Sequence, residues 1–195
     1  MRGRAAVLCG AAALAGCAGP ALKLESTLPA AAAPRPSYVG VEVAALGLDA
    51  IEPTVTAIAA ALKARAPSLN PALKPAVREL PEHEVALALA ADPTFEPGSA
   101  QLRAPALSDY ATLADELVSR SSVVVHVLVI DPAAAGPDSL AARRAATLHA
   151  LFEQRGVPAT RVRGEGRAGP DPRVEIVIKP VVAGREPEAW MPAAQ

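Results

Sequence analysis

Residues 121–156 read "SSVVVHVLVIDPAAAGPDSLAARRAATLHALFEQRG". The part up to Asp131 is an almost unbroken apolar run rich in β-branched residues, which predicts a strand buried on both faces and central in its sheet. From residue 138 to 156 apolar residues recur at helical spacing, with Asp138 as the expected N-terminal cap and Gly156 at the C-terminal end. The stretch therefore predicts a buried strand followed by an amphipathic helix.

The segments on either side of this stretch continue the same alternation. Apolar residues alternate as in strands at 83–91 and 173–179, recur at helical spacing at 104–120, and form a weaker strand pattern at 159–166. The resulting order is strand, helix, strand, helix, strand, strand. It predicts an α/β sandwich of βαβαββ order, in which two helices pack on one mixed sheet.

Arg144 lies in the middle of the apolar stripe of the helix expected at 138–156. At about 100° per residue it shares one sector with Leu140, Leu148 and Leu151. An arginine cannot lose its charge, so a buried one needs a partner or a route to water. The nearest candidate along the chain is Asp131, which ends the preceding strand.

Several motifs between about residue 85 and residue 179 resemble one known family. "LAARRA" at 140–145 matches an LSxxRA motif, "LFEQRGVPATRVRGEG" at 151–166 matches a helix end, a GVPA turn and a Gly-x-Gly strand end, and "DPRVEIVIK" at 171–179 is similar to a closing (N/D)RRVEI strand. Residues 92–117 resemble an opening segment with a Phe and a first helix. The family is that of the OmpA-like peptidoglycan-binding domains, found in OmpA, in the lipoprotein Pal and in flagellar MotB.

This resemblance implies non-covalent binding of the peptide stem of peptidoglycan, typically at its diaminopimelate. The residues at the family's binding positions are Asp131 and Arg144, with Asp138 and Arg173 as expected accessory contacts. An aspartate accepts from the ligand's ammonium, and an arginine fork grips its carboxylate. The chain departs from the family where Leu128 and Ile130 replace a Gly and a Thr, and the 131–139 loop is short. A purely structural Asp131–Arg144 pair is the alternative.

The beginning of the chain has the layout of a bacterial lipoprotein signal. Two arginines precede a short uncharged run that ends in "LAGC" at 14–17, similar to a lipobox. We therefore expect a signal peptide at 1–16 and lipidation of Cys17, with palmitate among its acyl chains. Because Ala18 and not Asp follows this cysteine, we expect the lipid to anchor the protein in the outer membrane, with its domain facing the periplasm.

The rest of the chain divides by composition. An Ala/Pro-rich tether is expected at 17–37 and an N-terminal segment of unknown role at 38–82, with a short strand at 38–46, a helix at 52–66 and prolines that interrupt 67–82. The OmpA-like domain is expected at 83–180. A C-terminal tail at 181–195 completes the division.

Composition and spacing disfavour several function classes. The formal net charge is −1, which argues against the basic face of a nucleic-acid binder. The three histidines are scattered without zinc spacing, and neither a metal nor another cofactor is expected. No nucleophile–base arrangement or carboxylate pair indicates an enzyme.

Two functions remain open from the sequence. The first is an outer-membrane lipoprotein that binds peptidoglycan and links the membrane to the cell wall. The second is a structural or assembly lipoprotein of an envelope complex, whose OmpA-like domain no longer binds peptidoglycan.

Overall fold

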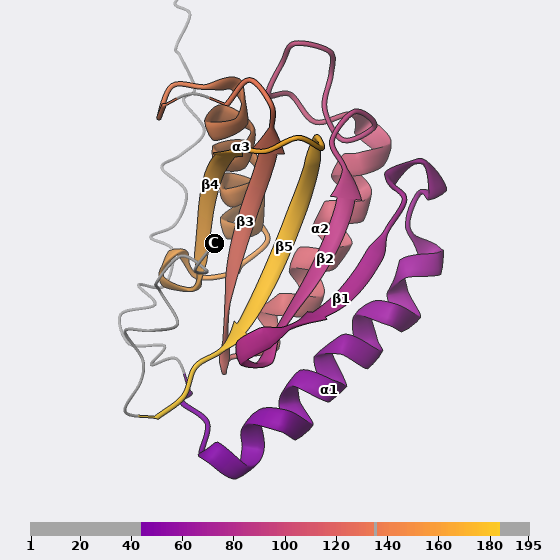
Figure 1. Cartoon of the computed structure of the whole chain (residues 1–195). Helices are drawn as coiled ribbons and strands as arrows, with labels where there is room; N and C mark the ends of the chain where they lie inside the picture. The colour runs from indigo at the N-terminus through magenta and orange to yellow at the C-terminus, as the bar shows by residue number, and fades with distance from the viewer. Residues whose placement is uncertain (1–43, 135, 184–195) are drawn as a thin grey trace, which may run out of the picture. The chain divides into compact units, whose positions relative to one another are not determined.

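The computed structural model of the chain describes residues 44–134 and 136–183 (Figure 1). The expected signal peptide, Cys17 and the tether lie outside the described residues, as does the tail beyond residue 183. No helix in the described ranges is long and apolar enough to cross a membrane.

A mixed sheet of five strands carries the fold. The strands are β1 Ala76–Leu80, β2 Glu84–Ala90, β3 Val123–Asp131, β4 Val162–Ala168 and β5 Arg173–Pro180, in the spatial order β1-β2-β5-β3-β4. Only β3 and β4 run parallel; the other neighbours are antiparallel. The expected α/β fold and the βαβαββ order are thus confirmed. The central strand, however, is β5 and not β3, because the last strand inserts between β2 and β3.

Three helices pack on the sheet instead of the expected two. They are α1 Leu48–Arg65, α2 Ala104–Val118 and α3 Leu140–Gln154. Their buried side chains form one core with alternate residues of the strands: Val85, Leu87 and Leu89 of β2, Val123, Val125, Val127 and Val129 of β3, and Val174, Ile176 and Ile178 of β5. In Figure 1, α2 and α3 lie behind the sheet, and α1 runs beside β1. The helices therefore close one face of the sheet.

The N-terminal segment belongs to this domain. Helix α1 confirms the helix expected at 52–66, and β1 pairs with β2 in the register Ala76↔Ala88 to Leu80↔Glu84. Sequence reasoning missed β1 because prolines stand directly before and after it; proline is tolerated at the ends of an edge strand. Of the strand expected at 38–46, residues 44–46 are described, and Leu46 forms a single bridge with Val182. The domain core therefore starts well before residue 83.

The N-cap of helix α3 lies one residue later than the sequence predicts. Ser139, and not Asp138, is the N-cap, and its Oγ accepts a hydrogen bond from the Ala142 backbone N–H at 3.1 Å. At the other end Gly156 takes a φ of +101°, the left-handed conformation that commonly ends helices at glycine.

The Gly-x-Gly motif lies inside β4, where α3 approaches the strand closely. A Cβ added to Gly164 would lie 2.7 Å from the Ala145 carbonyl oxygen, and one added to Gly166 would overlap the backbone at Ala142. Alanines on α3 complete this contact with small side chains. The two glycines are thus required by helix–strand packing.

A buried arginine joins three elements at the opposite end of β3. Arg161 is 1% exposed, and its guanidinium donates to the carbonyl oxygens of Leu117 at 3.0 Å and Val123 at 2.9 Å, and to that of Arg120. Burial lowers the pKa of Arg161 from its usual value. Because the carbonyls of Leu117 and Arg120 lie at and just beyond the C-terminal end of α2, the negative end of the helix dipole stabilises the cation.

We predict that Gly166→Ala destabilises the domain by about 1–3 kcal/mol, because the new methyl group forces α3 away from β4. Chemical denaturation of the two proteins measures the difference. Glu165→Ala is the matched control, since Glu165 is exposed on the same strand and its side chain points away from α3. Equal stability of Gly166→Ala and wild type would contradict the close packing described here.

Candidate functional site

The structure brings Asp131 and Arg144 together at one end of the sheet. Asp131 is the last residue of β3, and Arg144 lies in the second turn of α3, on the stripe that faces the core. The Arg144 Nη1 and Asp131 Oδ2 atoms are 3.6 Å apart. At this distance the two groups form an ion pair, but they are too far apart for a good hydrogen bond. The juxtaposition expected from the helical pattern is therefore present.

Two further groups hold the guanidinium of Arg144. Its Nε donates to the Ser99 carbonyl oxygen at 2.9 Å, and its central carbon lies 4.8 Å from the centroid of the Phe95 ring. The Arg144 side chain is 9% exposed. Sequence reasoning did not find these two contacts, although Phe95 is prominent as one of only two phenylalanines in the chain. The guanidinium therefore has a fixed position.

Hydrogen bonds fix the backbone around Phe95. Thr94 donates from Oγ1 to the Ala90 carbonyl oxygen at 2.7 Å and lies 3.3 Å from the Tyr110 hydroxyl. Burial of Tyr110 raises the pKa of its hydroxyl, which stays protonated. Arg103 Nε donates to the Phe95 carbonyl oxygen at 2.9 Å. The turn between β2 and α2 thus presents a rigid aromatic face to Arg144.

The outer edge of the pair reaches solvent. The terminal nitrogens of Arg144 make no hydrogen bond with the described residues. Every fully buried side-chain nitrogen or oxygen in the described ranges has a hydrogen-bond partner, so these terminal nitrogens are not fully buried. The Asp131 side chain is 20% exposed; its Oδ1 accepts from the Ala133 backbone N–H at 2.8 Å, and its Oδ2 faces Arg144. A cationic and an anionic group thus lie side by side at the surface.

The two expected accessory residues lie elsewhere. Asp138 is exposed, and its backbone carbonyl accepts from Arg143 Nη1 at 2.7 Å. Arg173 pairs with Glu175 at 2.8 Å, on the face of β5 turned away from the helices. Neither contacts Asp131 or Arg144 among the described residues. Asp138 and Arg173 are therefore not assembled with the pair.

The residues that depart from the family pattern also point away from the pair. Successive side chains of a strand alternate between its faces, so Leu128 and Ile130 lie on the opposite face from Val129 and Asp131. Leu128 indeed packs with Ala86 and Val177, apart from the main core. The larger side chains at 128 and 130 therefore do not fill the space beside Arg144.

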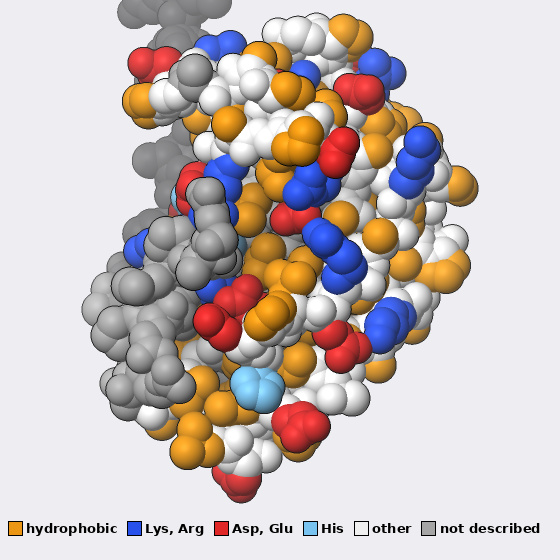
Figure 2. All heavy atoms as spheres, in the orientation of Figure 1, with side chains coloured by type: hydrophobic (Ala, Val, Ile, Leu, Met, Phe, Trp, Pro, Cys, Tyr) orange, Lys and Arg blue, Asp and Glu red, His pale blue; other side chains and the backbone are white. Residues whose placement is uncertain are grey.

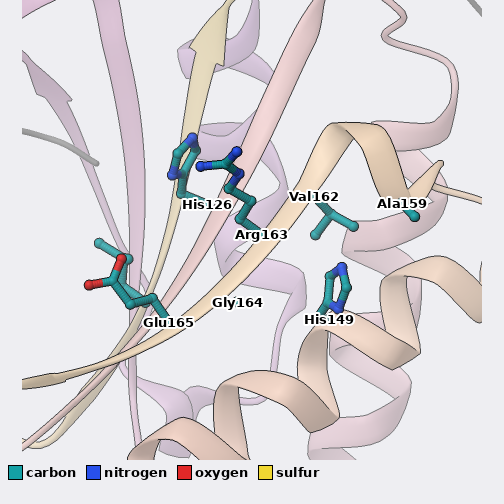
Figure 3. A pocket seen from close by; sticks show the side chains of 8 residues that line it. His126, His149, Ala159, Val162, Arg163, Gly164 and Glu165 are labelled. Atoms are coloured by element: carbon teal, nitrogen blue, oxygen red, sulfur yellow. The ribbon is translucent and has the colours of Figure 1, made fainter. Parts of the chain in front are cut away.

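Two surface hollows of about 400 Å³ lie along β4. One is lined by His126, His149 and Gly164 among others (Figure 3), and the other by Gly136, Pro137 and Gly166 among others. Asp131 and Arg144 line neither of them. Within the described ranges, no three His, Cys, Asp or Glu side chains gather closely enough to hold a metal ion.

Known structures share this fold. The chain is similar to a putative MotB-like protein from Desulfovibrio vulgaris, with a TM-score of 0.55, 17% identity, and coverage of 68% of this chain and 92% of that one. It is also similar to the periplasmic domain of Helicobacter pylori MotB, with a TM-score of 0.50, 15% identity, and coverage of 60% and 86%.

A third similar structure is the cell wall anchor of the type VI secretion system from Pseudomonas aeruginosa. Its TM-score is 0.50 and its identity 20%, with coverage of 63% of this chain and 96% of that one. No family model and no curated protein matches the chain. At identities this low, the similarity to these structures shows a shared fold only. This fold is the one that the sequence resemblance implies, and the prediction of the fold is therefore confirmed.

We predict that Arg144→Leu changes the free energy of unfolding by no more than about 2 kcal/mol. The variant loses a hydrogen bond to a charged group, which contributes about 1.5–3 kcal/mol, but gains burial of a leucine, also worth about 1.5–3 kcal/mol. Asp131 keeps its backbone hydrogen bond and contact with water. Thermal and denaturant unfolding check this, with Arg143→Leu on the exposed face of α3 as control. A loss above about 4 kcal/mol would show that Arg144 is chiefly structural.

Proposed function

We propose that this chain, whose fold is that of MotB periplasmic domains, binds the peptide stem of peptidoglycan without forming a covalent bond. The observation that carries the proposal is the solvent-facing edge of Arg144 beside Asp131 Oδ2, 3.6 Å away. The Ser99 carbonyl binds the guanidinium at Nε and the Phe95 ring packs on it, which leaves the terminal N–H groups without a hydrogen bond to the described residues.

The chemistry of diaminopimelate matches this pair. One carbon of this amino acid carries both a free ammonium and a carboxylate. The terminal N–H groups of Arg144 can bind the carboxylate in the two-pronged geometry that guanidinium favours, while Asp131 accepts from the ammonium. Because Arg144 is already fixed, binding costs little side-chain entropy. This role is one of binding and not of catalysis.

The proposed location is the outer membrane. The lipobox-like sequence before Cys17 supports lipidation there, and Ala18 supports transfer to the outer membrane. About three acyl chains would give stable anchoring, whereas one binds only marginally. The domain would face the periplasm, where peptidoglycan lies. The similar structure of a type VI cell wall anchor supports an envelope role of this kind.

One observation favours the alternative of an assembly protein with a degenerate site. The Arg144 side chain is only 9% exposed and is already in contact with Asp131, the Ser99 carbonyl and the Phe95 ring. A pair of this kind can be retained for packing alone. On this alternative the domain would dock on an envelope complex, and peptidoglycan would not be its partner.

We predict that Asp131→Ala lowers binding to purified sacculi at least about tenfold, the loss expected when one charge-assisted contact of about 1.5–3 kcal/mol is removed. Pull-down of the full chain with sacculi from a diaminopimelate-containing cell wall measures this. The control is Asp115→Ala, which removes an aspartate that pairs with Arg155 between α2 and α3, away from the site. A wild type that does not sediment with sacculi supports the assembly alternative.

We predict that Cys17→Ser releases the protein from the membrane into the soluble periplasmic fraction, because the cysteine is the proposed site of the lipid. Fractionation of cells that produce the two proteins, followed by immunoblotting, checks the expectation. A variant that remains with the outer membrane would contradict lipid anchoring. Sacculi binding of the released variant should be unchanged, which separates the anchor from the ligand site.

A further inference from the structure

Two arginines share one glutamate on the face of the sheet turned away from the helices. Glu175 Oε1 accepts a hydrogen bond from Arg173 Nε of the same strand, β5, at 2.8 Å, and another from Arg78 Nη2 of β1. Because both nitrogens contact one oxygen, the two guanidinium groups are held next to each other. Figure 2, in the orientation of Figure 1, shows basic and acidic side chains gathered at the surface over this part of the sheet.

Small side chains on β2 make this contact possible. Strand β2 lies between β1 and β5, so the Arg78 side chain has to cross it to reach Glu175. On β2, Ala86 pairs with Arg78 and Ala88 pairs with Glu175. Alanines leave the space over this strand open, and the aliphatic stem of an arginine packs well on such a surface. The sequence of β2 therefore assembles the Arg78–Glu175–Arg173 cluster.

This cluster keeps a net positive charge. The outward side chains of the five strands include three acidic residues and five basic ones: Glu84, Glu165 and Glu175, and Arg78, Arg163, Arg167, Arg173 and Lys179. Glu84 pairs with Lys179, and Glu165 pairs with Arg167. Glu175 instead pairs with both Arg78 and Arg173, so one positive charge in the cluster is left without a matching carboxylate.

The two arginines also have N–H groups to spare. A guanidinium carries five N–H donors. Beyond the bonds to Glu175, Arg173 Nη1 donates to the Asp171 carbonyl oxygen at 3.2 Å. Arg78 Nε and Nη1 and Arg173 Nη2 make no hydrogen bond with residues 44–134 or 136–183. The Arg78 side chain is 51% exposed and that of Arg173 33%, whereas Glu175 is 11% exposed. Two partly exposed cations thus flank a largely buried carboxylate.

We propose that Arg78 and Arg173, positioned by Glu175, bind a phosphate group. Glu175 already occupies the position between the guanidinium groups, so a further anion has to contact both of them from the solvent side. A phosphate has enough oxygens to accept from two arginines at once, and guanidinium is the side-chain group that best matches its geometry. The unmatched positive charge attracts it.

This site is separate from the one proposed for peptidoglycan. Asp131 and Arg144 lie on the helix-covered face of the sheet, and Arg78 and Arg173 lie on the opposite face. The proposal therefore does not depend on peptidoglycan binding. Its ligand chemistry is that of a phosphate group, whether free in solution or carried by the headgroup of an anionic lipid.

An NMR titration with inorganic phosphate tests the site. The full chain with Cys17→Ser is used, because it lacks the proposed lipid. The Nε–H resonances of Arg78 and Arg173 should shift in a saturable manner. Arg78→Gln and Arg173→Gln should each weaken binding about tenfold, the loss expected for one charge-assisted contact. Arg167→Gln is the matched control, since it removes the same charge from the same face, on β4. Screening by salt should keep its effect below about twofold.

Sedimentation with vesicles identifies the source of the phosphate. The same protein and variants are mixed with vesicles of phosphatidylglycerol, and neutral phosphatidylcholine vesicles give the baseline. Binding above this baseline that Arg78→Gln and Arg173→Gln abolish assigns the site to a lipid headgroup. Saturable binding of inorganic phosphate without binding to the anionic vesicles assigns it to a free phosphate.

Two results would overturn the proposal. The first is a wild-type site that responds neither to inorganic phosphate nor to the anionic vesicles. The second is binding that Arg78→Gln, Arg173→Gln and Arg167→Gln weaken equally, which would show diffuse attraction to a basic face and no defined site. Arg78 is exposed, so Arg78→Gln should fold as the wild type does. Arg173→Gln gives an independent reading of the same site.

Discussion

The charge of Arg144 is the constraint around which the end of the domain is organised. A guanidinium stays protonated, and a buried one is tolerated only when its N–H groups find acceptors or water. Here the Ser99 carbonyl, the Phe95 ring and Asp131 supply three different contacts from two other segments of the chain. These contacts fix α3 against the turn after β2 and against the end of β3. The same contacts leave the terminal nitrogens of the cation without a hydrogen bond to the described residues, and this is where the proposed ligand carboxylate would bind.

Close packing of α3 on β4 fixes the helix from its other side. Gly164 and Gly166 allow the backbone of α3 to approach the strand so closely that no side chain fits between them. At the far end of β3, Arg161 ties the start of β4 to the C-terminal end of α2. The helix that carries Arg144 is thus attached along its length to a rigid sheet. A binding residue on such an element keeps its position with little loss of entropy.

The sequence predicts the elements that have strong periodicity and fails where a contact is long-range. The patterns of β2, α2, β3, α3 and β5 indicate the βαβαββ order, and the helical spacing of Arg144 identifies its pairing with Asp131. The sequence does not predict strand β1, because its five residues stand between two prolines and become a strand only by pairing with β2. The contacts of Ser99 and Phe95 with Arg144 are not predicted either, because no local pattern relates these residues to a helix more than forty residues later. The insertion of β5 between β2 and β3 is likewise a property of the whole sheet.

The most direct test of the central claim is an NMR titration of the arginine side chains. Arg144 Nε–H and Nη–H resonances of the ¹⁵N-labelled chain would be followed while a peptide stem containing diaminopimelate is added, and again with a stem containing lysine. The lysine stem has the same length but lacks the second carboxylate. The proposal predicts that the Arg144 resonances shift with the first ligand and remain in place with the second, while those of Arg161 do not move. Unchanged Arg144 resonances with both stems, or equal shifts with the two, would contradict it.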